Sequence, residues 1–214
     1  MIIFDLDGVI VDSEPVHQAL EKRLFKELNI EVPPVEHQKL VGMNEENLWG
    51  TIIHQYKLNV DLQSVIEKKR TYMKSYLADP KAFKPIHGVI PLIKQLKQAN
   101  IKLVLASSSP LFYIKAILKK FAIDDAFEAT VSGEEVTNAK PAPDIFIEAA
   151  RRVGKKPQSC LVIEDSTNGV RAARAAGMIV LAYNDHRGGQ DLSQADFTID
   201  NFCNFDIKKY CYNS

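Results

Sequence analysis

The sequence predicts an α/β protein, with a parallel sheet covered by helices and an all-helical insertion after the first strand. Three observations support this prediction. Short apolar runs alternate with amphipathic stretches through most of the chain, which is the pattern of βαβ units. Residues 14–82 interrupt this alternation with helical periodicity alone. The length of 214 residues, 46% of them apolar, suits one α/β domain that carries a modest insertion.

Strands and helices alternate through the predicted core. The apolar runs predict strands at 2–4, 101–106, 127–131, 160–163 and 178–182. Helical periodicity lies between the later runs, at 88–99, 110–121, 142–153 and 167–176. Gly177 follows the last helix at the position where a glycine commonly ends one, and it leads directly into a strand. The segment after Asn201 has weak periodicity, and no element is assigned to it.

The segment between the first strand and residue 83 is the predicted insertion. It contains no convincing strand, and its amphipathic stretches lie at 15–28, 44–57 and 61–78. We therefore divide the chain into a core, residues 1–13 and 83–214, and a helical cap, residues 14–82. In open α/β sheets, ligands bind beyond the carboxyl ends of the strands. A cap that leaves the core just after the first strand would cover this site.

Acidic residues end two of the predicted strands. Asp5 and Asp7 lie where the first strand runs into a turn at Gly8, and Glu164 and Asp165 end a later strand in the same way. A carboxylate at a strand end costs stability unless it is paired, hydrogen-bonded or bound to a metal. One such acid is often only a helix cap. Two acidic ends in one parallel sheet can converge at its carboxyl edge, and an oxygen-rich site there suits Mg²⁺.

Two further strand ends carry complementary groups. Ser107, Ser108 and Ser109 follow one predicted strand, and Lys140 precedes a predicted helix. Phosphoryl transfer requires that the charge on the transferred oxygens be neutralised by positioned groups. A hydroxyl, an ammonium, a metal and a carboxylate nucleophile form such a set. The sequence therefore predicts a magnesium-dependent phosphoryl-transfer enzyme.

The order of these residues resembles the four motifs of the haloacid dehalogenase superfamily. The similar positions are Asp5-x-Asp7-Gly8, Ser107, Lys140-Pro141 and Glu164-Asp165. The stretches that resemble the phosphatase and β-phosphoglucomutase branch in particular are 5–17, 140–146 and 164–177. The resemblance extends over essentially the whole chain. It implies a Rossmann-like core and a small helical cap inserted after the first motif.

The resemblance also implies a role for each motif residue. Asp5 would attack phosphorus and form an aspartyl phosphate, and Asp7 would act as general acid and base. Ser107 and Lys140 would bind the phosphoryl oxygens. The expected ligands of Mg²⁺ are Asp5, the backbone carbonyl of Asp7, Asp165 and Glu164, the last directly or through water. Asp7 also distinguishes the chain from the dehalogenase branch, which typically lacks this second aspartate and needs no magnesium.

Two enzymatic functions remain open at this stage. The favoured function is hydrolysis of a small phosphorylated metabolite, for example a sugar phosphate, and the alternative is a β-phosphoglucomutase-type phosphotransferase. The mutase has a cap arginine that binds a second phosphate, and Glu45 aligns with that arginine here. Glu45 would repel a second phosphate, although Arg70 could compensate. A catalytically silent binding protein is less favoured because the motif residues are intact, and a receiver-like phosphoacceptor domain lacks such an insertion.

Four side chains outside the catalytic set are expected to bind substrate. His17 matches a cap-hinge histidine of the mutase, and Lys69 (or Lys68) matches its cap lysine. Glu45 lies in the cap loop, and Ser108 lies in the core. Each has a simpler interpretation. A histidine near the start of an amphipathic helix is often a surface residue. The basic run that contains Lys69 is most simply a solvated face, and a serine run is usually a solvated turn.

Composition and charge exclude several other classes. There are 27 basic and 27 acidic residues, so the chain lacks the basic footprint of nucleic-acid binders and a polybasic membrane anchor. No apolar run approaches the ~18 residues that a membrane span requires. The three cysteines are scattered and the N-terminal sequence resembles no secretory signal, so we expect a cytoplasmic protein. A capped site complete in one chain predicts a monomer whose partner is a small phosphorylated metabolite.

Overall fold

A parallel six-stranded sheet forms the centre of the core. The computed structural model describes residues 1–38, 40, 43–186, 189–203 and 205–210. The strand order is β5-β4-β1-β6-β7-β8, and every neighbouring pair is parallel. The strands are β1 (Ile2–Phe4), β4 (Leu103–Ser107), β5 (Ala129–Ser132), β6 (Leu161–Glu164), β7 (Ile179–Tyr183) and β8 (Phe197–Ile199). Because β1 lies between β4 and β6, the residues that follow these three strands meet at one edge.

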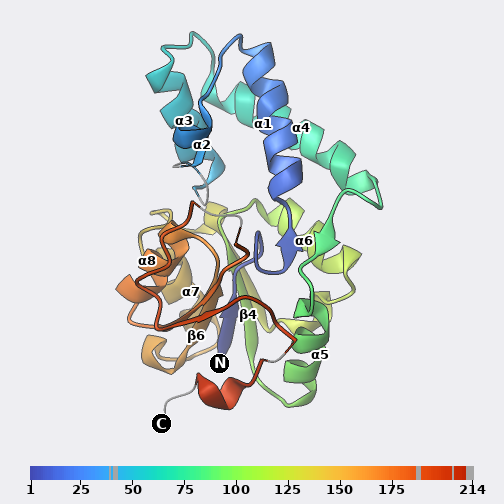
Figure 1. Cartoon of the computed structure of the whole chain (residues 1–214), viewed down its shortest axis with the longest axis vertical. Coiled ribbons are helices and arrows are strands. Elements are labelled where there is room, and N and C mark those ends of the chain that lie inside the picture. Colours follow the sequence, from blue (N-terminus) through green and yellow to red (C-terminus); the bar gives the residue numbers. More distant parts are fainter. Residues whose placement is uncertain (39, 41–42, 187–188, 204, 211–214) are drawn as a thin grey trace.

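Helices cover both faces of this sheet, as Figure 1 shows. On one face lie α5 (Val89–Gln98) and α6 (Leu111–Lys120), and on the other α7 (Asp144–Arg152) and α8 (Thr167–Ala175). Successive residues of a strand point to opposite faces, so Ile2 and Phe4 enter one apolar cluster and Ile3 the other. Gly177 follows α8 with a φ of 72°, as expected of a glycine that ends a helix. The predicted Rossmann-like core is confirmed.

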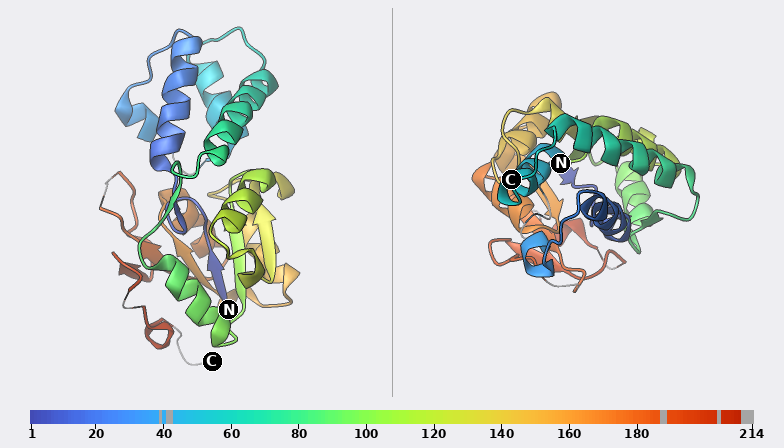
Figure 2. Two further views of the ribbon diagram at one scale, coloured as in Figure 1. Left: turned by 90° about the vertical axis from the view of Figure 1, so that its right-hand side faces the viewer. Right: turned by 90° about the horizontal axis from the view of Figure 1, so that it is seen from above.

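Two short strands connect the core to the helical insertion. β2 (Val11–Asp12) and β3 (Lys84–Pro85) pair antiparallel, so the chain enters and leaves the insertion side by side. Its helices are α1 (Glu14–Glu27), α2 (Pro34–Gln38), α3 (Glu45–Gln55) and α4 (Leu62–Ala78). The insertion stands above the carboxyl edge of the sheet in Figure 1 and in the left-hand view of Figure 2.

The helices of the insertion pack around an apolar cluster of their own. Phe25, Trp49 and Ile66 belong to it and are buried. Two helices begin with side-chain caps, because Asn44 accepts a hydrogen bond from the backbone N–H of Asn47 and Asp61 does so from Ser64. The insertion is therefore helical with a separate core. The domain boundaries at residues 13/14 and 82/83 stay a prediction.

Four strands and helices of the structure, β2, β3, β8 and α2, were not predicted. The β2–β3 ribbon joins segments more than seventy residues apart, so neither two-residue strand has a local signal. The edge strand β8 is only three residues long. The short helix α2 begins at Pro34, where a proline is tolerated because the first N–H of a helix has no intrahelical partner.

The described residues contain no helix with the length and apolar character needed to cross a membrane. Cys160 is a buried free thiol and Cys203 an exposed one, while Cys211 lies outside the described residues. The expected cytoplasmic location and monomeric state stay predictions.

Candidate active site

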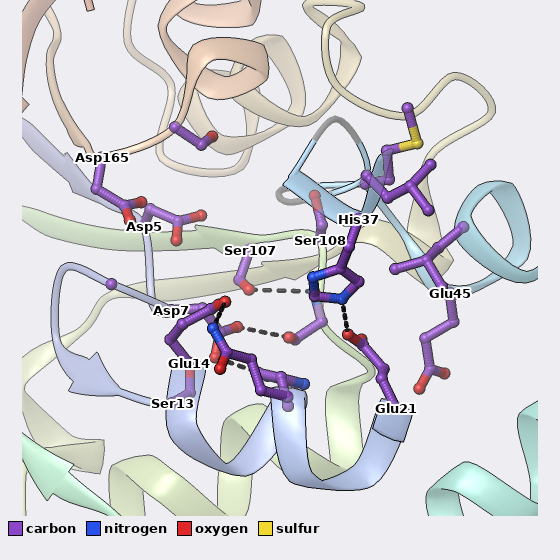
Figure 3. A pocket seen from close by; sticks show the side chains of 18 of the residues that line it. Asp5, Asp7, Ser13, Glu14, Glu21, His37, Glu45, Ser107, Ser108 and Asp165 are labelled. Atoms are coloured by element: carbon purple, nitrogen blue, oxygen red, sulfur yellow. Dashed lines mark hydrogen bonds and ion pairs between the residues drawn. The ribbon is translucent and has the colours of Figure 1, made fainter. Parts of the chain in front are cut away.

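A cavity of about 530 Å³ lies between the carboxyl edge of the sheet and the cap (Figure 3). All of the predicted site residues line it: Asp5, Asp7, His17, Glu45, Lys69, Ser107, Ser108, Lys140, Glu164 and Asp165. Six come from strand ends or the loops after them, one from the loop before α7, and three from the cap. A volume of this size suits a small metabolite. The structure thus places the predicted residues together, while their roles stay proposals.

The centre of the site is a buried chain of two ion pairs. Lys140 donates to Asp5 Oδ1 at 2.6 Å and to Glu164 Oε1 at 2.7 Å. Asp5 follows β1 and Glu164 ends the adjacent strand β6, so the parallel register brings both carboxylates within reach of one ammonium. All three side chains are buried. Burying such charges is costly unless they are paired in this way.

Glu164 is held on its other side by backbone and hydroxyl donors. Its Oε2 accepts from the N–H groups of Asp165 and Ser166, both at 2.8 Å, and from the Ser166 hydroxyl at 3.0 Å. Ser166 also caps α8 by accepting from the N–H of Gly169 at 3.0 Å. The carboxylate is therefore fixed by the start of α8. Its other oxygen binds Lys140.

Gly169 is required by the position of this carboxylate. A Cβ there would lie 1.7 Å from Glu164 Oε1, whereas a Cβ at Gly50 in α3 would have no neighbour within 4 Å. We expect Gly169→Ala to lower the free energy of unfolding by ~1–3 kcal/mol or more, the usual cost of overpacking. Gly50→Ala should raise it by ~0.5–1 kcal/mol, since alanine favours a helix interior. Urea unfolding measures both, and equal stability of the two variants would contradict the described packing.

Burial and like charge shift the pKa values of the acids. Burial raises the pKa of Asp5 to about 7, with Lys140 acting in the opposite direction and Glu164 and Asp7 adding to the increase. Burial, Glu164 and Asp5 together raise the pKa of Asp165 well above its ordinary value. Burial alone would lower the pKa of Lys140, but Asp5 and Glu164 outweigh it and raise the value. Lys140 is thus a charged lysine at neutral pH.

The donor set of this cluster suits a hard divalent cation. Asp5 and Glu164 both bond to the buried ammonium of Lys140, and burial and the like charge of these two acids raise the pKa of the nearby Asp165. A Cβ at Gly8 would lie 1.9 Å from Asp165 Oδ2, so the glycine admits this carboxylate next to the turn after Asp7. Within the described residues, no three His, Cys, Asp or Glu side chains form a ready-made metal cluster. Mg²⁺ keeps several waters and uses few carboxylates, so it does not need one.

Asp7 is held away from the ion-pair chain by hydrogen bonds. The hydroxyl of Ser109 donates to Oδ2 at 2.6 Å and that of Tyr113 to Oδ1 at 3.0 Å. The ring nitrogen Nε2 of His17 lies 3.5 Å from Oδ1. Burial acts to raise the pKa of Asp7, but hydrogen bonds with His17, Ser109 and Ser13 outweigh it and hold the pKa well below its usual value. In this arrangement Asp7 is a carboxylate that can accept a proton.

The serines at the end of β4 and in the loop after it line the site beside Asp7. Ser107 is buried, and its hydroxyl oxygen accepts from the N–H of Ser109 at 3.1 Å. Ser108 lines the cavity beside it. A Cβ at Gly133 would lie 2.8 Å from the Ser108 carbonyl, so close packing by the turn after β5 fixes this loop. Of these serines, Ser109 donates its hydroxyl to Asp7, and Ser107 and Ser108 line the cavity beside it.

The cap contributes a second polar cluster to the cavity. Lys69 on α4 lies 3.8 Å from Glu21 Oε1 and 3.7 Å from Glu45 Oε1, and all three side chains line the cavity. Glu21 also bonds to Nε2 of His37. Figure 3 shows Glu21, His37 and Glu45 on the side of the pocket away from Asp5 and Asp165. The bottom of the cavity therefore carries acidic side chains and Lys140, and the cap supplies a charged wall on the other side.

Comparison with known proteins identifies the family. The sequence model of haloacid dehalogenase-like hydrolases matches residues 2–183. The chain belongs to this family. It is 31% identical to the β-phosphoglucomutase of Bacillus subtilis strain 168, over 92% of this chain and 88% of that protein. It is 29% identical to a fructose-1-phosphate phosphatase of Escherichia coli strain K12, over 83% of this chain and 92% of that protein.

A solved structure of the same family supports the fold. A β-phosphoglucomutase from Clostridium difficile superposes with a TM-score of 0.85 at 25% sequence identity, covering 97% of this chain and 93% of that one. These comparisons confirm the predicted family, its phosphatase and β-phosphoglucomutase branch, and the prediction of an enzyme. A catalytically silent protein and a receiver-like domain are thereby set aside.

Sequence reasoning missed several residues of this haloacid dehalogenase-like site. Glu21 lies four residues after His17 on α1, so helical spacing alone could have placed it on the same face. Tyr113 lies on α6 but Ser109 precedes this helix, so no helical spacing relates the two residues. No local signal predicts His37 either, because its approach to Glu21 depends on how α2 packs against α1.

Proposed function

We propose that this haloacid dehalogenase-like hydrolase is a magnesium-dependent phosphatase that hydrolyses a small phosphorylated metabolite, for example a sugar phosphate. The observation that carries the proposal is the buried Asp5–Lys140–Glu164 chain at the base of the cavity, with Asp7 two residues further on. The relatives named above, a phosphatase and a phosphomutase of sugar phosphates, support the same substrate class.

The reaction would proceed in two displacements at phosphorus. A carboxylate oxygen of Asp5 attacks the phosphorus atom, the bond to the ester oxygen breaks, and an aspartyl phosphate forms. Asp7 gives a proton to the departing oxygen. Asp7 then takes a proton from a water molecule that attacks the aspartyl phosphate, which releases inorganic phosphate and regenerates Asp5. Lys140 and Ser107 would bind the phosphoryl oxygens during both steps.

Asp7 would have to change partners during this cycle. Its bonds to Ser109, Tyr113 and His17 favour the carboxylate, which suits activation of water. To donate a proton to the leaving oxygen, Asp7 must first be protonated and must turn from these partners toward Asp5. His17 belongs to α1 of the cap, so movement of the cap would change one of these contacts directly.

Mg²⁺ would be held by Asp5, Asp165 and the backbone carbonyl of Asp7, with Glu164 acting directly or through water. When bound, it would neutralise charge on the phosphoryl oxygens. Lys140 would remain between Asp5 and Glu164 and reduce the repulsion between Asp5 and an anionic substrate. The uncompensated carboxylates described above are the reason to expect the cation.

One observation favours hydrolysis over the mutase. Glu45 faces the cavity, and its Oε2 accepts from Arg70 Nε at 2.7 Å. Arg70 also donates through Nη2 to Glu134 of the core at 2.7 Å. Both sides of this guanidinium are therefore engaged by carboxylates. We therefore do not expect Arg70 to replace the arginine that binds a second phosphate in the mutase.

Phosphate release from a panel of phosphomonoesters tests the proposal. We expect release from at least one sugar phosphate to require Mg²⁺, to cease with EDTA and to return when Mg²⁺ is restored. In parallel, β-glucose 1-phosphate and its bisphosphate should show no isomerisation. Isomerisation without net phosphate release would show a mutase. A folded protein that turns over no phosphate ester would refute the proposed function.

A further inference from the structure

Lys69 is a buried cation whose hydrogen-bonding capacity is not used within the described part of the chain. Its side chain is 6% exposed, and it lines the cavity. The carboxylate oxygens nearest to it, on Glu21 and Glu45, lie at 3.8 and 3.7 Å, which is beyond hydrogen-bonding distance. A lysine ammonium has three donors, and Lys69 lines the cavity, where these donors can reach a ligand. Such a group is poised for a ligand atom.

The two carboxylates are themselves held from behind. His37 bonds to Oε2 of Glu21, and Arg70 donates to Oε2 of Glu45. In each case it is the other oxygen, Oε1, that faces Lys69. Arg70 is not among the residues that line the cavity. The Lys69 ammonium is therefore flanked by two fixed acceptors.

The Glu21 and Glu45 carboxylates are acceptors and the Lys69 ammonium between them is a donor, and this order indicates which ligand groups can bind. A hydroxyl oxygen can accept from the ammonium while its proton goes to a carboxylate. Two neighbouring hydroxyls would satisfy Lys69, Glu21 and Glu45 together, through charge-assisted bonds. A phosphate dianion brings no proton for the carboxylates. Bound to Lys69, its oxygens would lie against Oε1 of Glu21 and Oε1 of Glu45, and at this short range the charges repel one another.

We propose that Lys69, Glu21 and Glu45 form a subsite for a neutral, hydroxyl-bearing part of the substrate. This inference rests on the proposed function, because the phosphoryl group must lie at Asp5 for the other end to reach the cap. The subsite selects monophosphates of polyols or sugars that have adjacent hydroxyls. It discriminates against a second phosphate.

Matched substrates and matched variants test this inference. The substrates are hydroxyl-bearing monoesters (fructose 1-phosphate, glucose 6-phosphate and glycerol 3-phosphate), fructose 1,6-bisphosphate, and p-nitrophenyl phosphate, which has no hydroxyl on its leaving group. The variants are Lys69→Met and Glu21→Gln. The control is Lys68→Met, because Lys68 is the next residue on the same helix but is half-exposed and pairs with Glu27 outside the cavity. Thermal unfolding of each variant accompanies the kinetics.

We expect the wild type to prefer a hydroxyl-bearing monoester over the bisphosphate. Lys69→Met and Glu21→Gln should each lower the ratio of kcat/KM for the best such monoester to that for p-nitrophenyl phosphate by about 10- to 100-fold, the effect of losing a hydrogen bond to a charged group. Lys68→Met should leave the ratio unchanged. A ratio unaltered in the Lys69 and Glu21 variants, or a wild type that prefers the bisphosphate, would overturn the subsite while leaving the phosphatase intact. Failure to hydrolyse even p-nitrophenyl phosphate would instead refute the proposed function.

Discussion

Asp5→Asn should abolish phosphate release, with a loss of about 10⁴-fold or more, because the amide cannot serve as the nucleophile and no other carboxylate has its position. The substitution keeps the size of the side chain, and its carbonyl oxygen can still accept from Lys140. Phosphate release with Mg²⁺ on the best substrate measures the effect. Asp125→Asn is the control, since Asp125 is an exposed partner of Lys97 far from the cavity.

The stability of Asp5→Asn separates chemistry from folding. The pKa of Asp5 in the folded protein, about 7, lies above its ordinary value. An acid shifted in this direction lowers the stability of the folded state at pH values above its unfolded pKa. Removing the charge should therefore leave the metal-free protein at least as stable at pH 8. Retained activity, or inactivity together with early unfolding, would contradict this account of Asp5.

Lys140→Met should have the largest effect on stability. It leaves Asp5 and Glu164 buried and without their cation, and breaking a buried pair in this way typically costs ~3–5 kcal/mol. The pKa of Lys140 is raised in the folded protein, so its contribution is fully present at neutral pH and is lost only as the pH rises through that value. Urea unfolding at pH 7 in EDTA measures the loss. Activity should fall as well, because Lys140 would bind the phosphoryl group.

Two further variants serve as a control and as a rescue of Lys140→Met. Lys97→Met removes an exposed ion pair with Asp125 and should cost at most ~1 kcal/mol. The double variant Lys140→Met/Glu164→Gln removes one of the two unpaired buried carboxylates and should recover part of the lost free energy of unfolding. If Lys140→Met cost no more than Lys97→Met, the buried ion-pair chain would not be the electrostatic centre described here.

The sequence predicts the base of the site better than its cap. Asp5 follows β1 and Glu164 ends the adjacent parallel strand β6. The carboxyl ends of parallel strands lie at the same edge of a sheet, so a local pattern of acidic strand ends is enough to predict that these residues lie at that edge. The placement of Glu21 next to Lys69, and of His37 behind Glu21, depends instead on the packing of α1, α2 and α4, which no local pattern specifies. Lys69 and Glu45 were predicted from family resemblance, whereas Glu21 and His37 were not. The β2–β3 ribbon was missed because its pairing is long-range.

Arg70 illustrates the same limit. The sequence shows a cap arginine that could bind a second phosphate, and only the folded chain shows Glu45 and Glu134 on either side of it. Ion pairs between separate elements depend on tertiary distances. The two ion pairs of Arg70 are therefore the reason for our preference for hydrolysis over the mutase reaction, and they do not bear on the family.

The most direct test of the central claim is to trap the phosphorylated nucleophile. The protein would be mixed with substrate and Mg²⁺, quenched in acid within one turnover, and treated with borohydride, which reduces an acyl phosphate to an alcohol. Peptide mass spectrometry then locates the reduced residue. The account predicts homoserine in place of Asp5, dependent on substrate. Phosphate release with no modification at Asp5, or with the phosphoryl group on another residue, would contradict it.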